Sequence, residues 1–244
     1  MKREKIFNFL TRFAAPRDVK VVMENKKIDP FNILSVAWRL WRGVPVAKII
    51  NKKWFYGLPF YTDRHTLDPR PDSETLIDAV LKDTRGQKIR ILDLGTGTGC
   101  LLCALIKNMP GAVGIGIDRS RRARIVARRN VRDLGLEDRI KIVRGTFRNV
   151  GQGFDIVVSN PPYIAEGDVV DRGARHDPGI ALYGGRDGLK YYREIARIKT
   201  AAKIYVEIGA GQEKAVREIF AAAGRSVATG YKDLSGIVRV LAFS

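Results

Sequence analysis

Apolar residues at helical spacing dominate the first part of the chain, and short aromatic segments follow them. The run from Asp29 to Gly43 starts with an acid and a proline, repeats apolar residues three and four positions apart, and stops at glycine. These features predict an amphipathic helix with defined ends. Two aromatic segments flank Gly57 within residues 52–63 and predict a β-hairpin, in which Pro59 favours an edge position.

From residue 71 onward, nearly continuous apolar runs alternate with amphipathic stretches. Strands are predicted at 89–95, 112–118, 140–143, 154–159, 203–208 and 237–243. Helices are predicted at 72–82, before 106, after 118, at 189–200 and at 212–223. Such alternation is typical of a doubly wound, mostly parallel sheet. We therefore predict an α/β domain at 71–244, preceded by a small helical domain at 1–50 and an aromatic hairpin connector at 51–70.

The composition is that of an ordinary globular protein. Hydrophobic residues make up 45% of the 244 residues, and the mean hydropathy is -0.15. No apolar run approaches the ~20 residues needed to cross a bilayer, and the N-terminus lacks the apolar core of a secretory signal. We therefore expect a cytoplasmic protein that does not associate with a membrane.

Cysteine and histidine are scarce, which bears on metal chemistry. Cys100 and Cys103 form a C-x-x-C just inside a predicted helix, where this spacing puts both on one face and favours packing as small apolar residues. There is no second cysteine pair, and His65 and His176 lie far away in the sequence. We expect neither a metal site nor a redox role.

The net charge of +18 is the one unusual bulk property. It favours an anionic partner such as RNA, the ribosome, DNA or an acidic protein. The stretch from Arg119 to Arg148 is the densest part, with ten arginines and one lysine against three acids. Its apolar residues Ala123, Ala127, Val131 and Leu134 share one side of a helix, which leaves the arginines outside. Either this surface contacts RNA or the ribosome, or it is a solvated helix face, and charge alone does not decide between them.

A glycine-rich turn, DLGTGTG at Asp93–Gly99, lies where a strand gives way to a helix. Its three glycines let the backbone approach a ligand closely, and the helix start offers free N–H groups. The dinucleotide fingerprint G-x-G-x-x-G/A is not met, because Cys100 or Leu102 occupies the third position. The G-x-G-x-G spacing suits S-adenosylmethionine, which has no pyrophosphate to seat.

Asp118 ends the next strand, 23 positions after Gly95. A carboxylate there can accept hydrogen bonds from ribose hydroxyls. The alternative is a cap on the following helix. Because both cofactors contain ribose, Asp118 supports a nucleoside ligand without choosing between them.

The tetrapeptide Asn160-Pro161-Pro162-Tyr163 follows the strand FDIVVS directly. Consecutive prolines remove two backbone donors and restrict the chain, which leaves the local carbonyls free and fixed in place. The Asn160 side-chain oxygen and the carbonyl after it can then accept both hydrogens of a planar NH2 group, on which Tyr163 can stack.

This arrangement answers a chemical difficulty, since the nitrogen of an amide or an aromatic amine is a poor nucleophile with a delocalised lone pair. Holding both N–H bonds on acceptors directs the lone pair at the methyl of a sulfonium. Orientation of this kind can supply ~7–11 kcal/mol of the barrier. We therefore predict that these four residues are catalytic and that the reaction is N-methylation.

Several motifs occur together in a fixed order. They are GVPVAKI (43–49), PRPDSE (69–74), ILDLGTGTGC, VVSNPPYI, ARHDPGIALYGGRDGL (174–189), EIGAGQ (207–212) and DLSGIVRV (233–240). In this combination the chain resembles the HemK/PrmC family of glutamine methyltransferases, which modify class I peptide-chain release factors.

The resemblance implies a class I S-adenosylmethionine methyltransferase fold and a small N-terminal helical domain that grips the release factor. The substrate would be the glutamine of the Gly-Gly-Gln motif, held by Asn160, Pro161, Pro162 and Tyr163. The cofactor would contact Gly95, Thr96, Gly97, Thr98, Gly99, Asp118, Phe147 and Asn160.

The chain departs from the family pattern in three places. The region before Gly43 is short, Thr146 replaces the usual acid before Phe147, and Asp68 replaces an apolar residue before PRPDSE. These departures bear on partner docking and on the adenine contact.

Two other substrates share these motifs in part. A sister enzyme methylates a ribosomal-protein glutamine, and adenine methyltransferases of DNA or RNA also use N-P-P-Y. Adenine methylation is disfavoured, since no target-recognition domain follows the catalytic core. A non-catalytic RNA-binding protein is disfavoured by the intact glycine turn, Asp118 and Asn160.

Overall fold

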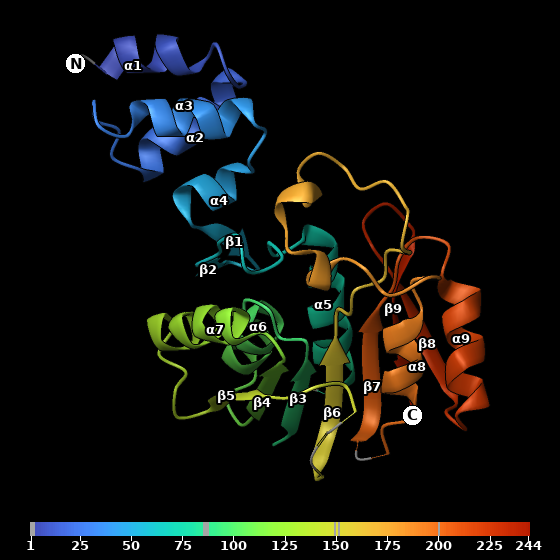
Figure 1. Cartoon of the computed structure of the whole chain (residues 1–244). Coiled ribbons are helices and arrows are strands. Elements are labelled where there is room, and N and C mark those ends of the chain that lie inside the picture. Colours follow the sequence, from blue (N-terminus) through green and yellow to red (C-terminus); the bar gives the residue numbers. More distant parts are fainter. Residues whose placement is uncertain (1–2, 85–87, 149, 151, 200) are drawn as a thin grey trace.

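The computed structural model describes residues 3–84, 88–148, 150, 152–199 and 201–244. Its centre is a seven-stranded sheet of order β5-β4-β3-β6-β7-β9-β8 (Figure 1). The first five strands in this order are parallel, and β9 runs antiparallel to both of its neighbours. The strands are β3 Arg90–Leu94, β4 Val113–Asp118, β5 Ile140–Arg144, β6 Phe154–Ser159, β7 Ala201–Glu207, β8 Val227–Lys232 and β9 Val238–Phe243.

Helices cover both faces of this sheet, as the alternating pattern predicts. The alternation of side chains along each strand divides the apolar residues, so Ile91 packs into one core and Leu92 into the other. The first core receives α5 (Glu74–Asp83), α6 (Cys100–Asn108) and α7 (Arg121–Asp133). The second core receives α8 (Lys190–Ala196) and α9 (Glu213–Ala222), and Phe220 stacks on Phe243 there with centroids 3.8 Å apart.

The arginine-rich helix α7 lies as its apolar pattern predicts. Ala123, Ala127 and Val131 are buried, and Leu134 packs partly buried at the end of the helix. Ser120 caps its start by accepting a hydrogen bond from Ala123 N over 3.2 Å.

The N-terminal helices form a separate cluster that stands away from the sheet (Figure 1). They are α1 Arg3–Leu10, α2 Pro16–Asn25, α3 Ile33–Trp41 and α4 Val46–Ile50. Their shared core includes Leu10, Val19, Val22 and Ile49, all fully buried. The antiparallel hairpin of β1 (Lys53–Phe55) and β2 (Leu58–Phe60), which the aromatic pattern predicts, connects this cluster to the first core of the sheet.

Three sequence predictions differ from the structure. Strand β8 was not predicted, because Val227–Lys232 has no apolar run and pairs only with β9 at the edge. The helix predicted at 189–200 ends at Ala196, and Thr200 lies outside the described residues. Helix α3 begins at Ile33 rather than at residue 30, since Asp29 Oδ1 accepts hydrogen bonds from the N–H groups of Phe31 and Asn32 and closes a turn there.

Within the described ranges, no helix combines the length and the apolar character that crossing a membrane requires.

Candidate active site

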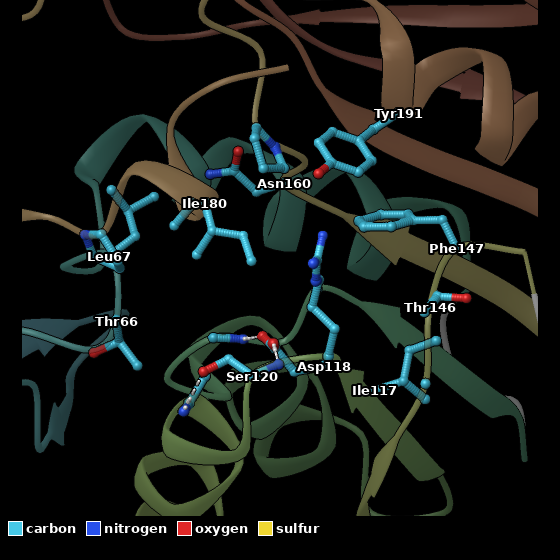
Figure 2. A pocket seen from close by; sticks show the side chains of 18 of the residues that line it. Thr66, Leu67, Ile117, Asp118, Ser120, Thr146, Phe147, Asn160, Ile180 and Tyr191 are labelled. Atoms are coloured by element: carbon cyan, nitrogen blue, oxygen red, sulfur yellow. Dashed lines mark hydrogen bonds between the residues drawn. The ribbon is translucent and has the colours of Figure 1, made fainter. Parts of the chain in front are cut away.

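A cavity of about 390 Å³ opens at the carboxyl ends of the parallel strands (Figure 2). This is where open α/β sheets bind ligands. The residues predicted from the sequence that line it are Gly95, Gly97, Asp118, Phe147, Asn160 and Pro162. Of the other predicted residues, Thr96, Thr98, Gly99, Pro161 and Tyr163 are not among those that line it.

The glycine turn forms the floor of the cavity. Gly95, Gly97 and Gly99 have φ values of 73°, 55° and 80°, which favour glycine. A Cβ on Gly95 would lie 3.2 Å from the Phe147 ring and so would narrow the cavity. The Thr96 hydroxyl donates to Asp93 Oδ2 over 2.5 Å behind the turn. The buried side chains of the turn therefore hold its shape, while Gly95 and Gly97 line the cavity.

Two aspartates flank this turn. Asp93 is buried, its Oδ1 has no hydrogen-bond partner among the described residues, and burial raises the pKa of its carboxyl to about 7. Asp118 accepts hydrogen bonds from Gly97 N over 3.1 Å and from Ser120 N over 2.7 Å. Burial raises the pKa of Asp118, although these two N–H groups and neighbouring arginines oppose that effect. Asp118 is thus fixed at the cavity wall.

Aromatic rings close one end of the cavity. Phe147 and Tyr191 have centroids 4.8 Å apart and planes inclined by 38° (Figure 2). Thr146 is exposed beside them, where the family pattern has an acid. The carboxylate that lines this end is instead Glu194 of α8, which pairs with Arg148 over 2.9 Å.

Asn160 follows the tip of β6 and lines the cavity. Its Nδ2 donates to Ser73 Oγ over 3.0 Å. Its side-chain oxygen accepts no hydrogen bond from the described part of the chain. The amide oxygen is therefore the atom that remains available to a ligand.

The rest of the N-P-P-Y segment is held by the later motifs. Gln212 Nε2 donates to the Tyr163 carbonyl over 2.9 Å, and Gln212 Oε1 accepts from Gly209 N over 3.0 Å. Tyr163 packs against the second core, where burial raises its pKa to about 12. Gly188 approaches the same segment so closely that a Cβ would lie 2.3 Å from the Tyr163 carbonyl oxygen.

We expect Gly188→Ala to lower both stability and methyl transfer. The added methyl would displace the N-P-P-Y segment, and φ at Gly188 is 72°. A loss of about 2–4 kcal/mol of unfolding free energy is expected in urea denaturation. Gly224→Ala is the matched control, because φ there is 78° but nothing lies within 4 Å of the added Cβ. Equal losses in the two variants would show that the contact with Tyr163 is unimportant.

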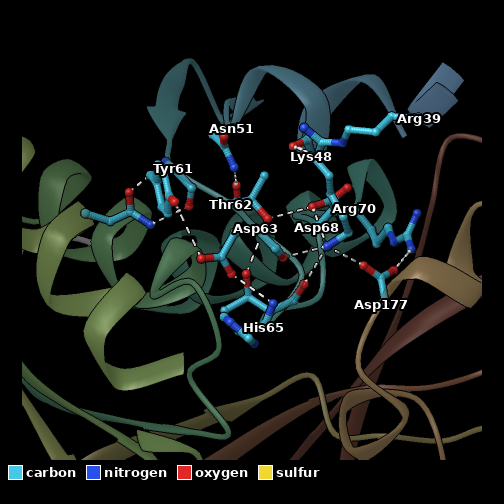
Figure 3. Close-up of polar contacts among 12 residues, drawn as sticks. Arg39, Lys48, Asn51, Tyr61, Thr62, Asp63, His65, Asp68, Arg70 and Asp177 are labelled. Carbon is cyan, nitrogen blue, oxygen red and sulfur yellow. Dashed lines mark hydrogen bonds and ion pairs between the residues drawn. The ribbon is translucent and has the colours of Figure 1, made fainter. Parts of the chain in front are cut away.

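A buried ion cluster lies beside the part of the cavity wall that Pro178, Ile180 and Ala181 form (Figure 3). Lys48 Nζ lies 2.8 Å from Asp177 Oδ1 and 3.2 Å from Asp68 Oδ1, and all three residues are buried. Arg70 Nη2 lies 2.6 Å from Asp177 Oδ2, and Thr62 donates to Asp68 over 2.6 Å. The charge of Asp68, which departs from the family pattern, is thus balanced by the charge of Lys48 on helix α4.

The two cysteines lie in the first core, as their spacing predicts. Burial raises the pKa of Cys100 to about 12, and it raises the pKa of Cys103 as well. Burial therefore disfavours the thiolate form of both cysteines. Among the described residues, no three histidine, cysteine or acidic side chains form a group that could hold a metal ion.

The sequence and the fold of this chain resemble those of known proteins. A family model described as Methyltransferase small domain matches residues 66–176. Proteins named Release factor glutamine methyltransferase from Bradyrhizobium diazoefficiens and Agrobacterium fabrum are 40% and 42% identical. Each match covers 86% of this chain, and the shares of the two relatives are 75% and 78%. The chain belongs to the release factor glutamine methyltransferase family.

Other relatives in this family are longer than the chain. The family member from Rhodospirillum rubrum is 43% identical, and the match covers 81% of this chain but 63% of that protein. Among solved structures, the human Mettl16 catalytic domain in complex with a MAT2A 3'UTR hairpin has a TM-score of 0.63 at 17% identity, over 95% of this chain and 82% of that one. The human methyltransferase 10 domain containing protein has a TM-score of 0.57 at 19% identity, over 78% of this chain and 90% of that one. The fold is therefore that of the class I S-adenosylmethionine methyltransferases.

The sequence did not point to several residues that the fold brings to the site. Thr66 and Leu67 enter from the connector, Ile180 from the 174–189 motif and Tyr191 from α8 (Figure 2). The motifs that contain or adjoin these residues were recognised, but nothing in their spacing shows which side chains face a common cavity.

Proposed function

We propose that this chain transfers the methyl group of S-adenosylmethionine to the side-chain amide nitrogen of the glutamine in the Gly-Gly-Gln motif of class I release factors. The observation that carries the proposal is the Asn160 amide at the tip of β6, with its oxygen free at the edge of a cavity whose floor is a glycine turn. The names of the family members support the choice of substrate.

The described residues fit the cofactor. The turn at Gly95 and Gly97 leaves space that a Cβ would reduce, and Asp93 Oδ1 is buried without a partner. Asp118 would accept hydrogen bonds from ribose hydroxyls, and Phe147 would contact the adenine. Thr96, Thr98 and Gly99 would act by keeping the turn in shape, because the two threonines are buried. Bound S-adenosylmethionine supplies an electrophilic methyl group on a sulfonium.

The substrate amide would be held by the N-P-P-Y segment. Asn160 Oδ1 and the Pro161 carbonyl would each accept one N–H of the glutamine NH2 group. Pro162, and Tyr163 through its hydrogen bond from Gln212, would keep the segment rigid. Held in this way, the nitrogen lone pair points along the new N–C bond. Transfer of the methyl group to this nitrogen would break the S–C bond of the cofactor, leave the electron pair on sulfur and release one proton from the nitrogen.

The N-terminal helices offer a surface for the protein substrate. Phe31, Leu34, Trp38 and Trp41 follow one side of α3 and its start, and their exposed fractions are 98%, 69%, 58% and 59%. Exposed aromatic residues at helical spacing are typical of protein interfaces. We propose that this side of residues 1–50 docks the release factor in the cytoplasm, where translation terminates.

The arginines on the outer side of α7 add a second surface. Arg121, Arg122, Arg128, Arg129 and Arg132 are all exposed. A surface of this charge favours phosphate, so contact with ribosomal RNA during substrate encounter is proposed here. Binding to an RNA oligonucleotide should then weaken steeply as salt is added.

The test uses S-adenosylmethionine labelled in its methyl group. The protein is incubated with a class I release factor, with the same factor carrying alanine in place of the Gly-Gly-Gln glutamine, and with a duplex oligonucleotide. Label is expected in the first sample alone. Label in the oligonucleotide alone would replace the proposal with adenine methylation, and label in both release factors would place the target at another residue.

A further inference from the structure

The Asn160 side chain is held from behind by two buried residues of other elements. Asn160 Nδ2 donates to Ser73 Oγ over 3.0 Å, and Ser73 Oγ donates to Glu207 Oε2 over 2.5 Å. Ser73 ends the 3-10 helix Pro71–Ser73, and Glu207 ends β7. They are 3% and 2% exposed, so bulk water does not compete for these hydrogen bonds.

Burial of the Glu207 carboxyl is unfavourable for the fold. Within the described part of the chain, it has no ion pair, since nearby Arg239 pairs with Asp72 and Asp233 instead. Burial raises the pKa of Glu207 to about 7, although the hydrogen bonds from Ser73 and Asn160 oppose this effect. A carboxyl kept in such a place is typical of a functional site rather than of a stabilising contact.

The chemistry of the three groups determines the direction of each hydrogen bond. A carboxylate can only accept, so the single hydroxyl hydrogen of Ser73 goes to Glu207. The Ser73 oxygen can then only accept from Asn160, and the NH2 group is the part of the amide that donates. A 180° rotation of the amide would place the Asn160 oxygen against an oxygen with no hydrogen to give.

We propose that Ser73 and Glu207 are positioning residues that fix the direction of the Asn160 amide, so that its oxygen and not its NH2 group meets the substrate nitrogen. This rests on the proposed function, in which Asn160 Oδ1 accepts an N–H of the glutamine. If the Asn160 amide were rotated by 180°, its NH2 group would face the NH2 group of the glutamine. Two donors would then meet, and the glutamine nitrogen would lose its reactive orientation. The PRPDSE and EIGAGQ motifs therefore share one task, although 134 positions separate Ser73 from Glu207.

Variants of equal shape test this role. Valine and threonine have nearly the same shape, but threonine keeps the hydroxyl group and valine has a methyl group in its place. Ser73→Val should therefore lower kcat by about 10- to 100-fold, whereas Ser73→Thr should keep most of the wild-type kcat. Glu207→Gln, which can donate as well as accept, should lower kcat similarly. Cofactor affinity should change little in each. Glu218→Gln, an exposed site on α9, is the control for the change of charge. Equal losses in the two Ser73 variants would show that packing alone matters and would overturn the proposal.

The dependence of kcat on pH distinguishes a positioning role from a packing role, because a change in packing alone would not shift it. The groups facing Glu207 are Ser73, Asn160, Asp72, Arg239, Cys100, Tyr163 and Tyr192. Because the protonated carboxyl no longer dictates the direction of the Ser73 hydroxyl, kcat should rise with pH through about 7, the raised pKa of Glu207. Glu207→Gln should lose this step. A step that persists unchanged in Glu207→Gln would contradict the proposal.

A measurement without substrate separates this proposal from the proposed function. The side-chain NH2 resonances of Asn160 in the full chain are assigned by their loss in Asn160→Asp and followed by NMR. They should shift with pH near 7 in the wild type and stop doing so in Ser73→Val and Glu207→Gln. If this holds while release factor is not methylated, the proposed function fails and the positioning stands. If release factor is methylated and the resonances do not respond, the positioning is wrong.

Discussion

Asn160→Ala is expected to lower kcat/KM for glutamine methylation by about 100- to 1000-fold, the scale seen when one preorganised polar contact to a reacting group is lost. Alanine removes the amide oxygen that we propose orients the substrate NH2 group, and it removes the hydrogen bond from Asn160 Nδ2 to Ser73 Oγ. Cofactor affinity should fall much less, because the glycine turn and Asp118 are unchanged. Single-turnover methylation and calorimetric titration of S-adenosylmethionine measure the two effects separately.

Asn108→Ala serves as the matched control, since Asn108 is exposed at the far end of α6 and its side chain donates to the Ala104 carbonyl of its own helix. Near-normal turnover in Asn160→Ala would show that the substrate amide is oriented elsewhere. A loss of cofactor binding as large as the loss of turnover would move Asn160 from the reaction to cofactor binding.

Lys48→Met is expected to cost about 3–5 kcal/mol of unfolding free energy, the usual cost of removing one partner from a buried ion pair. The substitution keeps the length of the side chain but leaves Asp68 and Asp177 buried without this cation. Lys48 Nζ also donates to the carbonyls of Asp63 and Thr66, both 2.8 Å away, so the connector would loosen as well. Urea denaturation measures the loss.

The loss should depend on pH in a definite direction. Burial already raises the pKa of Asp177 above 3.8, and without Lys48 the rise is larger. A carboxyl with a raised pKa in the folded state favours folding when it is protonated, so the defect should be smallest below about pH 4 and should grow as pH rises through the folded pKa. Adding Asp68→Leu to Lys48→Met should restore part of the stability. Lys82→Met, at an exposed site on α5, is the control, and an equal effect there would refute the role of the cluster.

The sequence by itself determined the elements that depend on local chemistry. Apolar runs predicted six of the seven strands of the sheet, five of them parallel, because helices cover both faces of this sheet and its strands therefore carry apolar residues on both faces. The glycine spacing at Gly95–Gly99 and the N-P-P-Y segment pointed to the two segments that line the candidate site, because each needs a backbone conformation that few residues allow. Strand β8 escaped prediction because its sequence, VATGYK, contains no apolar run and its pairing with β9 is not visible from local sequence.

Contacts between distant segments were decided only by the tertiary structure. The chain from Asn160 through Ser73 to Glu207 joins three motifs, and no local spacing reveals that their side chains meet. In the sequence, Asp68 is a charged residue where the family pattern has an apolar one. In the structure, Lys48 lies beside it and balances its charge. The local sequence determines which conformations a segment favours and which charges it carries. The partners of a buried polar group come from other elements, and the order of the strands in the sheet determines which elements lie next to it.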